Sequence, residues 1–75
     1  MENDLDVEKS YKTRDVVAKL RRLADCLEAG KRFEIQIAGQ RVQMPPTATV
    51  EFEYSRDGEE EEIEIELRWS RAQKE

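Results

Sequence analysis

Carboxylates are the most abundant ionisable groups in this chain, which has 18 aspartates and glutamates among its 75 residues. Five of them recur at alternate positions in two segments: Glu51, Glu53, Glu62, Glu64 and Glu66. Alternation puts side chains on one face of a β-strand, so these segments predict a shared acidic face. Such a face can bind Ca²⁺ or Mg²⁺, dock a basic partner, or simply keep an exposed strand soluble and resistant to edge-to-edge pairing. Because carboxylates on a flat sheet splay apart, we predict no metal site and keep cation binding or catalysis on this face as the alternative function.

Groups suited to catalysis are scarce. The chain contains no histidine, which is the commonest general base and transition-metal ligand. Its single cysteine, Cys26, has no histidine partner and cannot form an intramolecular disulfide. The serines likewise have no base to activate them for acyl transfer. We therefore predict a protein that is not an enzyme, with no catalytic residue and no cofactor.

The expected location of the protein follows from the segments that the sequence lacks. No apolar run approaches the length of a membrane span, and residues 1–15 lack the apolar core of a signal peptide. We therefore expect a cytoplasmic protein that does not bind membranes.

Basic and acidic residues are concentrated in different parts of the chain. Residues 9–32 carry eight basic and three acidic groups, a net charge of +5, whereas residues 51–66 carry nine acids and one arginine, a net charge of −8. Both sets could contribute to an interaction surface, for which the candidates are Glu51, Glu53, Glu62, Glu64, Glu66, Arg14, Arg21 and Arg22. This pattern predicts a small protein-interaction or accessory module whose partner is another protein. Nucleic-acid binding through the basic helix is a less favoured alternative, because the whole chain has a net charge of −5 and its aromatic residues fall on predicted core positions.

One amphipathic helix must position the basic groups. Thr13 is suited to cap its first turn, and Asp15 complements the positive end of its dipole. Apolar residues then recur at helical spacing and form one stripe: Val16, Val17, Leu20, Leu23, Ala24 and Leu27. Gly30 is placed where a helix often ends in a left-handed conformation.

Four alternating strands follow, in two predicted hairpins. With Gly39 and Gln40 as the first turn, Ile37 faces Val42 and Ile35 faces Met44. With Asp57 and Gly58 as the second turn, the register gives the pairs Phe52–Ile63, Val50–Ile65, Glu53–Glu62 and Glu51–Glu64. Because both turns bring apolar residues opposite each other, the pattern predicts an antiparallel four-stranded meander with the helix on its apolar face, an α+β fold.

The organisation is that of one small domain over residues 5–71, with a disordered acidic tail at 1–4 and a frayed end at 72–75. Residues 5–11 alternate weakly and leave open a short additional strand. One helix lying diagonally can shield most of a four-stranded sheet face, so we expect a monomer or a weak homodimer.

Three sequence features together resemble the Amphi-Trp domain family: Leu23-Ala24-Asp25-x-Leu27-Glu28-x-Gly30, then Met44-Pro45, and then Gly58 followed by four glutamates and Ile63-Glu64-Ile65-Glu66-Leu67-Arg68-Trp69. The resemblance covers roughly residues 5–71. It implies a small prokaryotic, often archaeal, domain with an amphipathic C-terminal strand that ends in tryptophan. It implies no catalytic residues, since the family has no established biochemical role. Trp69 continues the alternation, so we expect it at the end of the core, with an exposed binding anchor as the alternative.

Overall fold

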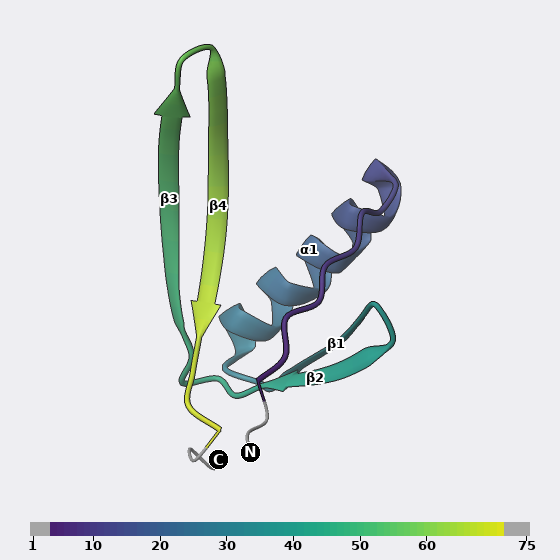
Figure 1. Ribbon diagram of the computed structural model, residues 1–75. Coiled ribbons are helices and arrows are strands. Elements are labelled where there is room, and N and C mark those ends of the chain that lie inside the picture. Colours follow the sequence, from purple (N-terminus) through teal and green to yellow (C-terminus); the bar gives the residue numbers. More distant parts are fainter. Residues whose placement is uncertain (1–3, 72–75) are drawn as a thin grey trace.

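The computed structural model describes residues 4–71 of the chain. It contains one helix and four strands: α1 (Thr13–Ala29), β1 (Phe33–Ile37), β2 (Gln40–Met44), β3 (Thr49–Asp57) and β4 (Glu60–Arg68) (Figure 1). The predicted α+β class is confirmed. Residues 4–12 form no regular secondary structure, so the additional strand left open for residues 5–11 is not formed. Of the predicted acidic tail only Asp4 is described, and the end predicted to fray, residues 72–75, lies outside the described residues.

The four strands form two separate antiparallel hairpins, β1–β2 and β3–β4, so the predicted four-stranded meander is wrong. The connection between β2 and β3 explains the separation. Pro45 follows β2 directly and has no N–H to donate to a sheet ladder. The amide of Ala48 then donates to the carbonyl oxygen of Pro45 at 3.2 Å. This turn directs β3 away from β2 instead of returning it alongside (Figure 1).

The first hairpin differs from its predicted register by two residues. Ala38 and Gly39 form its turn, with φ angles of 49° and 82°. Positive φ at both central residues is the feature of a type I′ turn, whose twist matches that of the flanking strands. Ile35 therefore lies opposite Val42, and Phe33 lies opposite Met44. The predicted pairs Ile37–Val42 and Ile35–Met44 are wrong, although the same residues still share one face.

The second hairpin is also shifted by two residues. Asp57 pairs with Glu60, which leaves Gly58 and Glu59 as the turn, and Gly58 has a φ of 63°. Glycine as the first central residue is typical of a type II′ turn. The observed pairs on the apolar side are Val50–Leu67, Phe52–Ile65 and Tyr54–Ile63, which replace the predicted pairs Phe52–Ile63 and Val50–Ile65.

The helix begins and ends close to its predicted limits. Lys12, not Thr13, is the N-cap residue, and no side chain caps the first turn. The carbonyl oxygen of Lys12 instead accepts bonds from the amides of Asp15 and Val16, at 2.9 and 3.0 Å. At the other end Gly30 adopts the left-handed conformation as predicted, with a φ of 67°. Its amide and that of the next residue satisfy carbonyl groups of the last turn, which is a Schellman motif.

The core is small and lies between α1 and the first hairpin. Phe33 and Met44, which face each other across β1 and β2, are 5% and 2% exposed and are the only buried large apolar residues among those described. The guanidinium carbon of Arg22 lies 5.1 Å from the centre of the Phe33 ring. One Arg22 nitrogen also donates to the carbonyl oxygen of Glu34 at 3.0 Å. Arg22 therefore ties the helix to β1 through a cation–π contact and a hydrogen bond.

We call α1, β1 and β2 the body, and the hairpin of β3 and β4 the arm. The arm stands beside the body and diverges from α1 (Figure 1). No Cα atom in the strands of the arm lies within 8 Å of one in the helix or strands of the body. With nine residues in each strand, the arm is nearly twice as long as the five-residue strands of the body. The helix therefore covers the β1–β2 hairpin and not the arm.

Candidate functional site

The five candidate glutamates lie together on one face of the arm, which we call the acidic face: Glu51, Glu53, Glu62, Glu64 and Glu66. Glu51 lies opposite Glu66, and Glu53 lies opposite Glu64. Glu62 lies opposite Ser55. The predicted pairs Glu53–Glu62 and Glu51–Glu64 are therefore wrong, because the turn is one residue further along the chain. The acidic face still contains two directly opposed pairs of like charge.

The opposed charges have an electrostatic consequence at Glu64. The carboxylate of Glu62 on the same strand, followed by that of Glu53 across the hairpin, raises the pKa of Glu64 above its ordinary value. Like charges that face each other across a strand pair are destabilising. The fold therefore maintains an unfavourable concentration of negative charge on an exposed surface.

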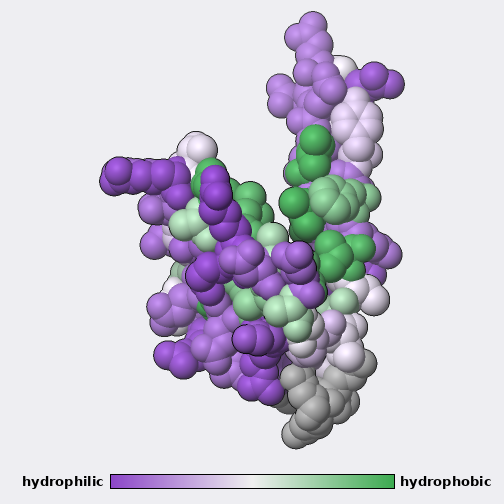
Figure 2. Space-filling view, turned by 180° about the vertical axis from the view of Figure 1, so that it is seen from behind, coloured by the Kyte–Doolittle hydropathy of each residue, from purple (hydrophilic) through white to green (hydrophobic). Residues whose placement is uncertain are grey.

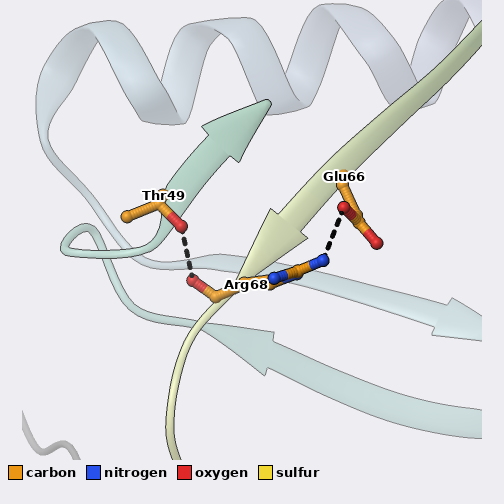
Figure 3. A network of polar contacts seen from close by, with 3 residues as sticks. All are labelled: Thr49, Glu66 and Arg68. Carbon is orange, nitrogen blue, oxygen red and sulfur yellow. Dashed lines mark hydrogen bonds and ion pairs between the residues drawn. The ribbon is translucent and has the colours of Figure 1, made fainter. Parts of the chain in front are cut away.

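One arginine partly offsets this charge at the base of the arm. A terminal nitrogen of Arg68 lies 3.0 Å from a carboxylate oxygen of Glu66, and Thr49 donates a long hydrogen bond of 3.5 Å to the Arg68 carbonyl oxygen (Figure 3). The hydrogen bond from Arg68 to Glu66 raises the pKa of the arginine. Because both side chains are largely exposed, this ion pair adds little to stability. The ion pair offsets negative charge at the end of the acidic face nearest the body, and the carboxylates of Glu51 and Glu53 also raise the pKa of Arg68.

The geometry of the acidic face bears on cation binding. Within residues 4–71 no three acidic or thiol side chains are grouped so that they could hold a metal ion. The opposed pairs bring together two carboxylates each, whereas Ca²⁺ takes six to eight oxygen ligands.

The basic candidates lie on a different part of the molecule. Arg14, Arg21 and Arg22 belong to α1, which is in the body, and all three are exposed. Arg22 is engaged with β1 as described above. The eight candidate residues therefore form two regions, one on the arm and one on the helix, and not one contiguous site.

The other face of the arm is apolar and largely uncovered, which the sequence analysis missed. Its side chains are exposed by 39% at Val50, 77% at Phe52, 55% at Tyr54, 73% at Ile63 and 44% at Ile65. The Tyr54 hydroxyl donates to a Glu61 carboxylate oxygen at 3.0 Å, and this bond raises the pKa of the tyrosine. The prediction that Phe52 and Tyr54 are core residues is wrong. The alternation predicts which residues share this face, but the nine-residue length of β3 and β4, which carries the face beyond the five-residue strands of the body, appears only in the structure.

A groove separates the base of the arm from the body. It has a volume of about 870 Å³ and is lined on the body side by Leu20, Leu23, Phe33, Ile35, Ile37, Val42 and Met44. On the other side it is lined by Ile65 and Leu67 of the arm and by Trp69, which follows β4. Charged residues and the N-terminal segment complete the lining: Lys19, Glu64, Glu66, Asp6, Val7 and Glu8. Figure 2 shows this groove, with apolar side chains on both sides of it. Trp69 is half-buried here, so it contributes to the wall of the groove.

The family model described as "Amphi-Trp domain" matches residues 1–75, the whole chain. The chain belongs to the Amphi-Trp domain family. The resemblance noted in the sequence is thereby confirmed. No curated protein and no solved structure gives a significant match.

Within residues 4–71 no helix is both long enough and apolar enough to cross a membrane.

Proposed function

We propose that this chain is a non-catalytic protein-interaction module of the cytoplasm whose acidic face binds a basic segment of another protein. The observation that carries the proposal is the pair of opposed carboxylates at Glu53 and Glu64, in which like charges face each other on an exposed surface. Lysine or arginine side chains from a partner would relieve this repulsion on binding. A basic partner thus gains an attraction and removes an unfavourable interaction in the free protein.

The shape of the arm supports the same function. An interaction module needs an accessible surface, and the acidic face lies on a projecting hairpin with strands of nine residues. Its charge repeats at every second residue, so an extended segment with lysines or arginines at the same spacing would match it. The exposed arginines of α1 favour nucleic acid less, because Arg22 already bonds to β1 and the whole chain is acidic.

The test is binding of a fluorescent peptide rich in lysine and arginine, followed by anisotropy. We expect binding at low salt that weakens steeply as salt is added, and no binding of an acidic peptide of equal length. Glu53→Gln and Glu64→Gln should each weaken binding. Glu28→Gln removes the same charge from the exposed end of α1 and should leave binding unchanged.

Two results would contradict the proposal. One is equal affinity for the basic and the acidic peptide. The other is an equal loss of basic-peptide binding in Glu28→Gln and Glu64→Gln. Binding would then depend on the net charge of the chain and not on the acidic face. Affinity purification from native cells at low salt then identifies the partner.

A further inference from the structure

The chain as a whole has more surface than a compact monomer of its size. Its accessible surface is 6746 Å², whereas a compact monomer of 8.8 kDa has about 4,800 Å². Its radius of gyration is 14.1 Å, compared with about 11 Å for a compact domain of 75 residues. The difference in area, which includes the chain ends, exceeds the roughly 800 Å² that each partner buries in a standard protein interface. The chain therefore exposes enough surface to form a stable interface.

Apolar side chains are exposed on both the arm and the body. On the arm, Phe52 and Tyr54 alone expose on the order of 250 Å², given their exposed fractions and the size of aromatic side chains. On the body, Val16, Val17 and Leu20 of the helix are 36%, 39% and 46% exposed. Isolated two-stranded hairpins are at best marginally stable in water and need a helix or further strands over their apolar face. The arm lacks such a cover within its own chain.

We propose that a second copy of this chain provides that cover, in a symmetric dimer in which each arm lays its apolar face on the groove and helix of the other copy. Two-fold symmetry produces two identical contacts, because the arm of each copy meets the body of the other. The same arrangement covers the uncovered arm and the uncovered groove of both copies.

Charge complementarity within the chain also favours a second copy. Residues 9–32, which include α1, have a net charge of +5, and residues 51–66, which include most of the arm, have a net charge of −8. Laying the arm of one copy along the helix of the other brings these opposite charges near each other around the apolar contact. Lys19, which lines the groove, is placed to meet carboxylates at the margin of an incoming arm. One chain thus carries both halves of a complementary pair.

The dimer is independent of the proposed function, because the two faces of the arm serve different contacts. The apolar face is covered by the second copy, while Glu51, Glu53 and Glu62 on the opposite face, which do not line the groove, remain free for a basic partner. A failure of peptide binding leaves the dimer proposal standing, and the converse also holds.

The test measures the mass of the intact chain by sedimentation equilibrium from nanomolar to high micromolar concentration. We expect twice the monomer mass of 8.8 kDa, which is 17.6 kDa, at micromolar concentration and above. Phe52→Glu places a charge at the centre of the apolar face and should raise the dimer Kd by at least about thirtyfold. Ser55→Glu adds the same charge to the opposite face of the same strand and should leave the Kd within about threefold of the parent.

A second measurement covers the case in which Phe52→Glu does not fold. Amide hydrogen exchange of the unmodified chain is measured across the dilution series. The amides of β3 and β4 should lose protection from exchange as the dimer dissociates, and those at the centre of α1 should lose less protection. A parent chain that sediments at 8.8 kDa throughout the concentration range overturns the proposal. So does a dimer that persists when Phe52→Glu retains the helical circular dichroism of the parent, or arm protection that does not change on dilution.

Discussion

Replacement of Phe33 by alanine tests where the stability of the body resides. Phe33 is 5% exposed and faces Met44, which is 2% exposed, across the first hairpin. Arg22 lies over its ring, with the guanidinium carbon 5.1 Å from the ring centre. The substitution removes the ring from both neighbours. It leaves a cavity between α1 and β1, where Arg22 of the helix contacts the Phe33 ring.

The cost follows from this burial. Truncation of a buried phenylalanine to alanine destabilises proteins by about 3–5 kcal/mol, and a cation–π contact adds about 0.5–1 kcal/mol at an exposed site. We therefore expect a loss of about 4 kcal/mol. The total stability of a 75-residue domain is typically about 4–11 kcal/mol. The substitution should therefore remove all of the stability at the lower end of this range and about a third of it at the upper end.

Urea unfolding followed by far-ultraviolet circular dichroism is the appropriate assay, because it reports on α1. With a urea dependence of about 1 kcal/mol per molar, typical of the smallest domains, the midpoint should fall by about 4 M or the transition should lie at zero urea. Leu5→Ala is the control, since Leu5 is 67% exposed and outside every helix and strand. It should change stability by less than about 0.5 kcal/mol. A loss below about 1 kcal/mol for Phe33→Ala would refute the location of the core.

Three further predictions follow from the arm and the helix end. Acidification from neutral pH should stabilise the chain through Glu64. Its raised pKa means that the folded state binds the proton more tightly than the unfolded state does. The increase in the free energy of unfolding begins as pH falls through the raised pKa and is complete below the ordinary value of 4.5. Glu64→Gln should abolish this part of the pH dependence of the thermal midpoint, and an unchanged pH profile would contradict the assignment. Gly30→Ala should cost about 1 kcal/mol in urea unfolding, because alanine is strained at a φ of 67°, while Gly30→Asn should cost less; equal stability of all three chains would argue against the left-handed cap. Millimolar Ca²⁺ or Mg²⁺ should give no heat in calorimetric titration and no shift of the thermal midpoint, and a saturable signal that Glu53→Gln removes would restore the cation alternative.

The sequence was sufficient to predict the elements and the faces of the strands. The helix is recognisable because an apolar stripe runs up to Gly30, and only glycine adopts the left-handed cap conformation without strain. The faces of the strands follow from alternation with a period of two. The α+β class follows from these two patterns together.

The registers and the arrangement of the hairpins could not be read from the same patterns. A shift of two residues keeps every side chain on the same face, so apolar pairing in the predicted register could not distinguish it from the true one. The turns determine the register of each hairpin. In the first turn Ala38 adopts a positive φ, and in the second Gly58 is the first central residue rather than the second. Similarly, alternation shows that Phe52 and Ile63 share an apolar face but not which surface covers that face. The acidic face was predictable, whereas the exposed apolar face behind it was not.

The separation of the arm from the body has a consequence for cooperativity. Because the Cα atoms of the two parts nowhere approach within 8 Å, few interactions require the arm to be formed when the body is formed. Each hairpin and the helix close through contacts that are local in sequence, which form in about 0.1–10 μs in isolated peptides. A single chain should thus unfold in two steps, with the arm as the less stable cooperative unit. Association of two chains would make the order of each arm depend on the body of its neighbour, so that cooperative unfolding becomes a property of the pair and its transition temperature rises with protein concentration.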